Sequence, residues 1–268
     1  SEQVSGRNVI SYSSGIKQFD RKNIEFFPGQ VILVGSRPSI GLTTFLFYLY
    51  YNLWNSNRLP QCFITNEENG EQAYTRLITT ATGIELTTLN KKIGVLNEMN
   101  DEILQSEQNF ILSSQSSWEL IKAELTTLIG EKGIKAVYLD KIQGLFSEKK
   151  YKTRKQELSY IISDIKEFAV DNQVVFILSS ALGRSVERRE GKYPILSDLR
   201  ESGALEEYAD TVFLLHRPVM YGITLDENGD SLQNIAELRI AKNRFGPTGD
   251  LRFSFHAEIP QFGEFAGY

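Results

Sequence analysis

One stretch of the chain, from Pro28 to Phe47, joins an apolar run of β type, a loop of Gly, Ser, Arg and Pro, and a helical segment, PGQVILVGSRPSIGLTTFLF. A strand that passes through a glycine-bearing loop into a helix points backbone N–H groups and a helix N-terminus at a phosphate. The phosphate-loop formula is Gly, four residues, then Gly-Lys-Ser/Thr. Gly41 and Thr43 satisfy this formula, whereas Ser36 replaces its first Gly and Leu42 replaces its Lys. The stretch therefore predicts a phosphate-binding loop that lacks its principal charge.

The composition is that of one ordinary globular domain of 268 residues, with 41% hydrophobic and 24% charged residues. The net charge of −5 argues against nucleic-acid binding through overall basicity, although it permits local basic patches. Cys62 is the single cysteine, so no internal disulfide forms, and its apolar surroundings favour a buried structural thiol over a reactive one. No apolar run is long enough for a membrane span and no signal-peptide pattern opens the chain, so we expect a cytoplasmic protein without a membrane partner.

Short apolar segments alternate with segments of helical periodicity through most of the chain. We expect strands over 30–35, 61–65, 109–112, 135–140, 173–179 and 210–216. We expect helices over 43–55, 71–82, 117–130 and 157–170, with two short helices within 84–108. This alternation predicts an α/β fold in which helices flank a mostly parallel sheet.

The two ends of the chain have a different character. Residues 1–27 have no clear period, and we expect an irregular lead-in segment there. Residues 235–242 and 250–256 alternate apolar and polar side chains and are joined by FGPTG, which predicts a terminal antiparallel hairpin. No internal repeat or linker divides the chain, so residues 1–268 are expected to form a single domain.

A site that hydrolyses a nucleotide needs a phosphate cradle, a Mg²⁺ ligand, a base that orients water and a cation for the transition state. Thr43 follows the loop at the position whose hydroxyl would reach Mg²⁺, and Asp140 ends an apolar strand. Glu67 follows the strand 61–65, at the sheet edge where ligands bind in open α/β sheets. Each residue also has a structural alternative, because strand-ending carboxylates often cap helices and Lys242 and Arg244 also fit a solvated hairpin tip.

Taken together and in this order, these segments resemble the ATPase domain of DnaB-type replicative DNA helicases, which has a RecA-like P-loop NTPase fold. The resemblance covers nearly the whole chain. It rests on SSGIKQFD, FFPGQVILVGSRPSIGLTTF, ITNEENGEQAYTRLITTATGI, KAVYLDKIQGL, SSALGRSVERREGKYPILSDLRESGALEEYADTVFLLHR and IAELRIAKNRFGPTGDLRFSFH. Within the fifth of these segments, LSDLRESG and ADTVFLLHR are the most specific matches.

The resemblance implies catalytic roles for residues at matching positions. Glu67 would be the catalytic base, and Thr43 and Asp140 would hold Mg²⁺. Arg244 would be an arginine finger that completes the site of a neighbouring subunit in a ring, and Lys242 would accompany it at the γ-phosphate.

The resemblance also implies binding roles. The residues that would contact ATP are Arg37, Ser39, Gly41, Leu42, Thr43, Thr44 and Asp140. The turn with Arg200, Glu201 and Gly203 matches the family turn that faces the central channel and touches single-stranded DNA. The cationic run 149–155 either adds to that surface or is a plain solvated loop. The implied partners are single-stranded DNA and a homo-oligomeric ring, a hexamer, or other helicase and replisome subunits.

Two positions depart from the family pattern, and both normally contact phosphate. Leu42 replaces the Walker lysine, and Ala181 replaces the glutamine that senses the γ-phosphate. Losing one preorganised charge-stabilising group costs about 3–4 kcal/mol of barrier, or about 10²–10³ in rate. We therefore expect weakened binding of ATP and Mg²⁺. The N-terminal domain and linker helix of the family have no match in the sequence.

Two hypotheses follow for the activity. The first is a replicative-helicase-like ATPase domain that acts on single-stranded DNA in DNA replication and couples its movement to ATP hydrolysis, which we expect to be impaired. The second is a non-hydrolysing homologue that serves as a DNA-binding or replisome assembly partner. A small-molecule kinase with a phosphate loop fits poorly, because LSDLRESG and the hairpin with Arg244 would have no role in it.

Overall fold

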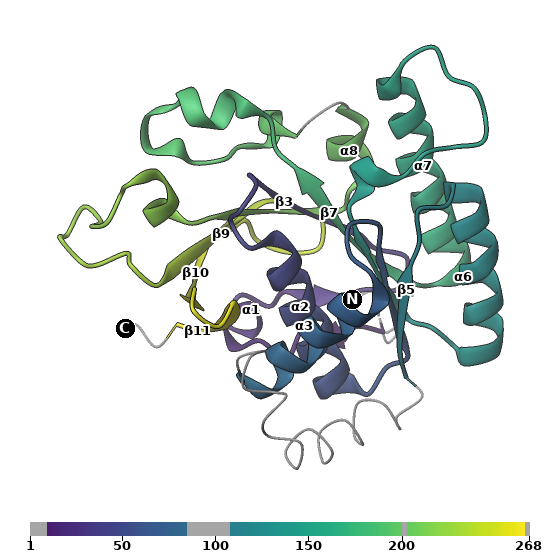
Figure 1. Ribbon diagram of the computed structural model, residues 1–268, viewed down its shortest axis with the longest axis horizontal. Coiled ribbons are helices and arrows are strands. Elements are labelled where there is room, and N and C mark those ends of the chain that lie inside the picture. Colours follow the sequence, from purple (N-terminus) through teal and green to yellow (C-terminus); the bar gives the residue numbers. More distant parts are fainter. Residues whose placement is uncertain (1–9, 85–107, 200–202, 266–268) are drawn as a thin grey trace, which may run out of the picture.

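The computed structural model describes residues 10–84, 108–199 and 203–265. Within these residues a nine-stranded sheet has the order β11-β10-β9-β8-β3-β7-β6-β4-β5, with helices on both of its faces (Figure 1). Six neighbouring strands are parallel: β8 Thr211–His216, β3 Val31–Ser36, β7 Val175–Ala181, β6 Ala136–Asp140, β4 Gln61–Thr65 and β5 Asn109–Ser113. The expected mostly parallel α/β sheet is confirmed.

The rest of the sheet is antiparallel. It comprises β9 Ile235–Asn243, β10 Gly249–His256 and β11 Gln261–Glu264, and β9 pairs with β8. The predicted hairpin of β9 and β10 is therefore present. This C-terminal hairpin is confirmed, and β11, which the sequence did not predict, extends the sheet by one strand and buries Phe262 against Phe45 and Phe255.

The helices form two layers because alternate side chains of each buried strand point to opposite faces. On one face, Ile32 and Val34 of β3 pack in a cluster with helices α2 Leu42–Asn57 and α3 Gly70–Thr82. On the other face, Val31 and Leu33 pack with α6 Trp118–Lys132, α7 Arg154–Asn172 and α8 Gly203–Tyr208. Cys62 lies fully buried in this second cluster, as expected.

The capping residues of the helices explain where several helices and strands begin or end. Gly83 closes α3 and Gly133 closes α6, both in the left-handed conformation that glycine adopts without strain. Gln173 closes α7 in the same conformation, so β7 begins at Val175 and runs to Ala181, two residues later than expected. Arg154 and Lys155 of the cationic run belong to α7 and not to a loop, because Thr153 caps that helix.

The irregular lead-in expected over 1–27 is wrong for its described part. It contains β1 Tyr12–Ser13, α1 Lys17–Asp20 and β2 Glu25–Phe26, and β1 pairs with β2. Phe19 is fully buried, with its ring 5.3 Å from that of Phe213 and 6.0 Å from that of Phe253. Tertiary packing of this aromatic side chain orders a segment that has no local period.

The loops between strands hold short 3₁₀ turns: η1 Ile142–Gly144, η2 Arg184–Arg188, η3 Glu190–Lys192, η4 Leu196–Asp198 and η5 Pro218–Tyr221. The two short helices expected within 84–108 fall almost wholly outside the described residues. None of the helices in the described part of the chain has the length and apolar character needed to cross a membrane.

Candidate functional site

The loop between β3 and α2 has the backbone form of an anion cradle. Ser39 and Gly41 adopt left-handed conformations, with φ of 64° and 101°. A Cβ atom on Gly41 would lie 3.1 Å from Cε2 of Phe255, so glycine suits both the torsion and the space. Helix α2 starts at Leu42, and no side chain of the described residues caps its first turn. Its initial N–H groups are therefore available to an anion.

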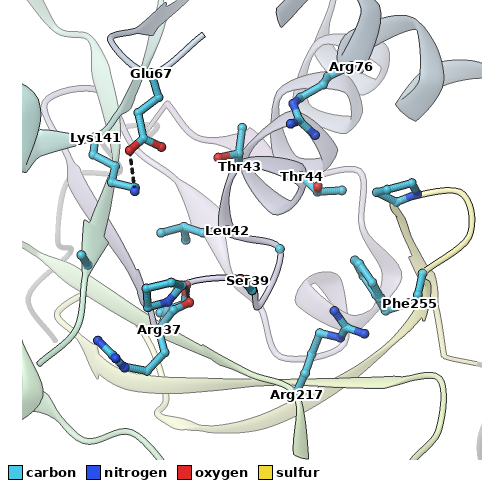
Figure 2. A pocket seen from close by; sticks show the side chains of 16 residues that line it. Arg37, Ser39, Leu42, Thr43, Thr44, Glu67, Arg76, Lys141, Arg217 and Phe255 are labelled. Atoms are coloured by element: carbon cyan, nitrogen blue, oxygen red, sulfur yellow. Dashed lines mark hydrogen bonds and ion pairs between the residues drawn. The ribbon is translucent and has the colours of Figure 1, made fainter. Parts of the chain in front are cut away.

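The predicted residues of the phosphate loop line one pocket of about 430 Å³ together with Glu67 and Ala181. The members from the loop are Arg37, Ser39, Gly41, Leu42, Thr43 and Thr44. Four cationic side chains from different elements surround this pocket, and they belong to Arg37, Lys141, Arg76 and Arg217 (Figure 2). Glu67 is the one acidic side chain among the described lining residues. This excess of positive charge suits an anionic ligand.

Asp140 lies beneath the pocket as the last residue of β6, and it is fully buried. Its carboxylate accepts hydrogen bonds from Thr43 Oγ1, at 2.7 Å, and from the Ser179 hydroxyl on neighbouring β7. Burial raises the pKa of Asp140, and these two hydrogen bonds partly oppose that effect. The structure thus brings together the two residues that the sequence predicts as magnesium ligands.

This donor set fits Mg²⁺, which prefers oxygen ligands and keeps several waters beside one or two carboxylates and substrate phosphates. Thr43 and Asp140 offer one hydroxyl and one carboxylate at the start of α2. Within the described residues, no group of three or more His, Cys, Asp or Glu side chains could hold a metal without further ligands. A magnesium ion here would therefore depend on phosphate oxygens and water.

Glu67 follows β4 and reaches the pocket from the sheet edge, as the sequence predicts. Its Oε1 lies 2.6 Å from Nζ of Lys141, which follows Asp140 (Figure 2). The sequence analysis did not predict Lys141 as a site residue. Its position next to Asp140 was a usable signal, since consecutive residues at the end of a strand lie at the same edge of the sheet.

Arg76 and Arg217 were also missed. Arg76 on α3 forms an ion pair with Glu68 at 2.6 Å. Arg217 follows β8, is 7% exposed and places its guanidinium 3.8 Å from the ring centre of Phe255. Its Nε has no hydrogen-bond partner among the described residues, and burial lowers the pKa of Arg217. Both arginines lie in segments that carry the family resemblance, Arg217 at the end of ADTVFLLHR and Arg76 within ITNEENGEQAYTRLITTATGI, but the resemblance assigned a role to neither.

Ala181 ends β7 directly beside Ser36 of β3. Its backbone N–H donates to Oε1 of Gln143 at 3.1 Å, and Nε2 of Gln143 donates to Ser180 Oγ at 2.8 Å. Leu42, which is 8% exposed, lines the same pocket. The two apolar replacements, Leu42 and Ala181, therefore line the same pocket, although about 140 residues separate them in sequence.

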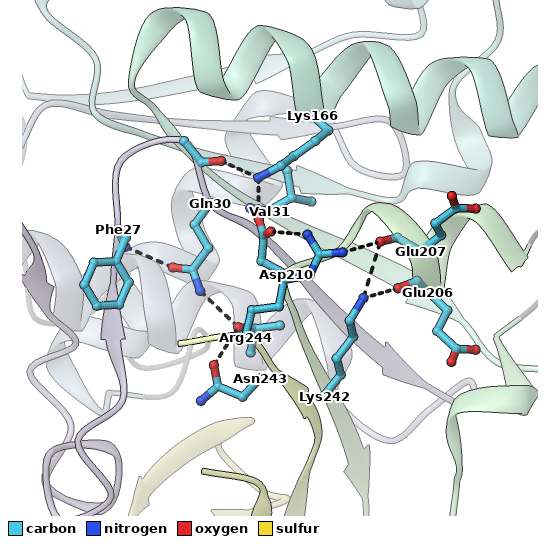
Figure 3. Close-up of polar contacts among 12 residues, drawn as sticks. Phe27, Gln30, Val31, Lys166, Glu206, Glu207, Asp210, Lys242, Asn243 and Arg244 are labelled. Carbon is cyan, nitrogen blue, oxygen red and sulfur yellow. Dashed lines mark hydrogen bonds and ion pairs between the residues drawn. The ribbon is translucent and has the colours of Figure 1, made fainter. Parts of the chain in front are cut away.

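Lys242 and Arg244 lie in a different polar network and do not line the pocket (Figure 3). Nζ of Lys242 donates to the Glu206 carbonyl at 2.6 Å, and Nη2 of Arg244 donates to the Glu207 carbonyl at 3.1 Å. These carbonyls belong to the last turn of α8, where cations are favourable. Nη1 of Arg244 also lies 3.2 Å from Oδ1 of Asp210.

Of the predicted DNA-contacting turn, Gly203 begins helix α8 and is exposed. Arg200 and Glu201 lie outside the described residues. Helix α8, which begins at Gly203, also supplies the carbonyls that bind Lys242 and Arg244.

Comparisons with known proteins show the family of the chain. The family model described as DnaB-like helicase C terminal domain matches residues 11–264. The chain is 30% identical over 287 residues to the replicative DNA helicase DnaB of Rickettsia typhi, covering 96% of this chain and 57% of that protein. It is 34% identical over 265 residues to a probable replicative DNA helicase of Trieres chinensis, covering 96% of this chain and 58% of that protein. The chain thus spans somewhat more than half the length of these relatives.

Solved structures give the same result. A DnaB-like replicative helicase, studied with its interactions with primase, superposes with a TM-score of 0.85 at 30% identity, covering 97% of this chain and 63% of that one. A second solved structure, described as an ATPase domain, has the same TM-score and identity and covers 97% of this chain and 93% of that one. The chain belongs to the DnaB-like helicase C-terminal domain family.

Proposed function

We propose that the chain is a replicative-helicase-like ATPase domain that binds ATP with Mg²⁺ at the pocket of the β3–α2 loop and hydrolyses it slowly. The observation that carries this proposal is the convergence of an uncapped helix N-terminus, the Thr43–Asp140 pair and Glu67 on one cationic pocket. These are the cradle, the metal ligands and the base that phosphoryl transfer to water requires.

Each group has a definite task in this proposal. The backbone N–H groups at the start of α2 bind phosphate oxygens. Thr43 and Asp140 hold Mg²⁺, which would neutralise charge on the phosphates when it is bound. Glu67 orients a water molecule for attack, since its carboxylate is 44% exposed and faces the pocket.

Slow hydrolysis is proposed because two groups that stabilise phosphate charge are absent from the pocket. Leu42 presents an apolar side chain where a lysine would neutralise the β- and γ-phosphates, and Ala181 offers no side-chain donor. Such donors act mainly on the transition state, so their loss lowers the rate of hydrolysis more than it lowers nucleotide binding.

The partners are proposed from the same family membership. Arg244 and Lys242 do not reach the pocket of their own chain, which supports a role at the ATP of a neighbouring subunit in a ring, a hexamer. Arg200, Glu201 and Gly203 would bind the backbone of single-stranded DNA, for which local positive charge suffices despite the net charge of −5. Other replisome proteins are further candidate partners.

The alternative is a homologue that does not hydrolyse ATP and acts as a DNA-binding or replisome assembly partner. The coincidence of Leu42 and Ala181 in one pocket favours this alternative, because both replacements weaken contacts with the same phosphates. It differs from the main proposal in predicting no turnover that depends on Glu67.

A steady-state ATPase assay with and without single-stranded DNA separates the two. We expect slow turnover that single-stranded DNA stimulates and that Glu67→Gln abolishes, because the amide cannot act as the base. Glu71→Gln on α3 is the matched control and should leave turnover unchanged, since Glu71 does not line the pocket. Turnover that survives Glu67→Gln would contradict the assignment of the base.

A further inference from the structure

Lys141 brings an ammonium group into a pocket whose loop has none. It lines the same cavity as Leu42 and Ala181, and its Nζ lies 2.6 Å from Oε1 of Glu67. Its side chain is 28% exposed, so it is neither buried in the core nor free in solvent. The start of α2 thus lacks a lysine, but Lys141, which directly follows β6, places a positive charge in the same pocket.

The backbone of Lys141 is held firmly at this edge. Its N–H donates to Oδ1 of Asn66 at 3.0 Å, and its carbonyl accepts from Nδ2 of Asn66 at 2.9 Å. A side chain on Gly144 would collide with this amide, because a Cβ atom there would lie 2.3 Å from Nδ2 of Asn66. These two hydrogen bonds fix the backbone of Lys141, so its ammonium group can change position only through rotation about the bonds of its four-carbon side chain.

The other three cations of the pocket are engaged differently. Arg217 stacks its guanidinium on the ring of Phe255, 3.8 Å from the ring centre, and has no carboxylate of the proposed chemistry as its partner among the described residues. Arg37 pairs with Glu187 and donates to the Leu182 carbonyl at 2.8 Å. Arg76 donates through Nε to both carboxylate oxygens of Glu68 at 2.8 Å. Arg37 and Arg76 each bind groups that have no proposed role in hydrolysis. Lys141, in contrast, pairs with the carboxylate proposed as the base.

We propose that Lys141 is the phosphate-binding lysine of this pocket and that it exchanges partners when ATP binds. Without nucleotide, its ammonium group pairs with Glu67. With nucleotide, the ammonium moves to the phosphate oxygens, which carry more negative charge, and the carboxylate of Glu67 becomes free to orient water. Lysine suits this exchange because it is a compact point charge with three donors. The inference rests on the proposed function, since it requires that ATP bind here.

A simpler role for Lys141 is to neutralise Glu67, and the two roles predict different results for a double substitution. If Lys141 only offsets the charge of Glu67, it becomes dispensable once Glu67→Gln removes that charge. If Lys141 contacts phosphate, removing it weakens binding in the Glu67→Gln background as well. Comparison of the double variant with Glu67→Gln alone therefore isolates the contact with phosphate.

The experiment is calorimetric titration of the whole chain with ATP and Mg²⁺. Glu67→Gln should tighten binding, because it releases Lys141 and removes a negative charge near the phosphates. Adding Lys141→Met to Glu67→Gln should then weaken binding by about tenfold or more, the effect of losing one charged hydrogen bond. Lys132→Met, at the exposed end of α6, is the control and should bind ATP as the natural chain does.

A second substitution tests whether Lys141→Met weakens ATP binding merely because the variant does not fold. Leu42→Lys added to Lys141→Met should restore ATP binding, because it returns a cation to the same pocket from α2. Equal ATP affinity of Glu67→Gln and the double variant would overturn the role of Lys141 and leave the proposed function intact. Failure of the natural chain to bind ATP at all would overturn both.

Discussion

Leu42→Lys is expected to raise the rate of ATP hydrolysis by about 10²–10³-fold, the effect of restoring one preorganised charge at a transition state. Leu42 is the first residue of α2 and lines the pocket beside Thr43, so a lysine there extends toward the phosphates held by the helix N-terminus. Its 8% exposure and contacts within the core cluster leave the stem of a lysine in apolar surroundings that it tolerates. Steady-state turnover with single-stranded DNA measures the effect.

Leu42→Met is the matched control, because it introduces an unbranched side chain without adding charge. It should leave turnover at the level of the natural chain. If Leu42→Lys gains neither turnover nor tighter ATP binding, the loss of function extends beyond this position, with Ala181 as the next residue to restore.

Asp210→Ala is expected to lower the free energy of unfolding by about 3 kcal/mol, the effect of breaking a buried ion pair. Asp210 is buried, and its Oδ2 accepts from the Val31 N–H at 2.8 Å and from Lys166 Nζ at 2.6 Å (Figure 3). The substitution leaves Lys166, which is 22% exposed, without its carboxylate. It also frees Arg244 from a contact with Oδ1 and so loosens the predicted finger.

Urea denaturation monitored by circular dichroism measures this loss. Asp250→Ala is the control, because Asp250 is 61% exposed and pairs with Arg239 at 2.9 Å on the surface of the hairpin. An exposed ion pair contributes little, so the control should lose about 0.5 kcal/mol. Equal losses from the two substitutions would show that the network around Asp210 does not stabilise the sheet.

The parts of the fold that the sequence predicts are those whose signal is local. Strand β4 falls on the expected residues 61–65, because a fully buried apolar run lies between Pro60 and Asn66. Strand β11 was missed because its four residues, QFGE, include one buried aromatic and a glycine, which is too little for a period. The lead-in was misjudged for the same reason, since Phe19 is ordered by distant rings.

The residues of the site likewise fall into those that the sequence predicts and those that it does not. The loop residues converge because they are consecutive, and Glu67 and Asp140 converge because their strands β4 and β6 are neighbours and both end at one edge. Arg76 and Arg217 reach the pocket through helix packing and through the position of β8 in the sheet. Both lie in segments that resemble the family, but the resemblance assigned neither of them a role in the site. Lys141 was detectable in principle, since it follows a predicted magnesium ligand.

Single-turnover kinetics with the protein in excess over ATP tests the central claim most directly, because it separates nucleotide binding from hydrolysis. We expect the natural chain to bind ATP with Mg²⁺ and to convert it slowly, and Leu42→Lys to convert the bound ATP about 10²-fold faster or more. Conversion by the natural chain as fast as by Leu42→Lys would contradict impaired hydrolysis. Absence of bound ATP would contradict the assignment of this pocket as a nucleotide site.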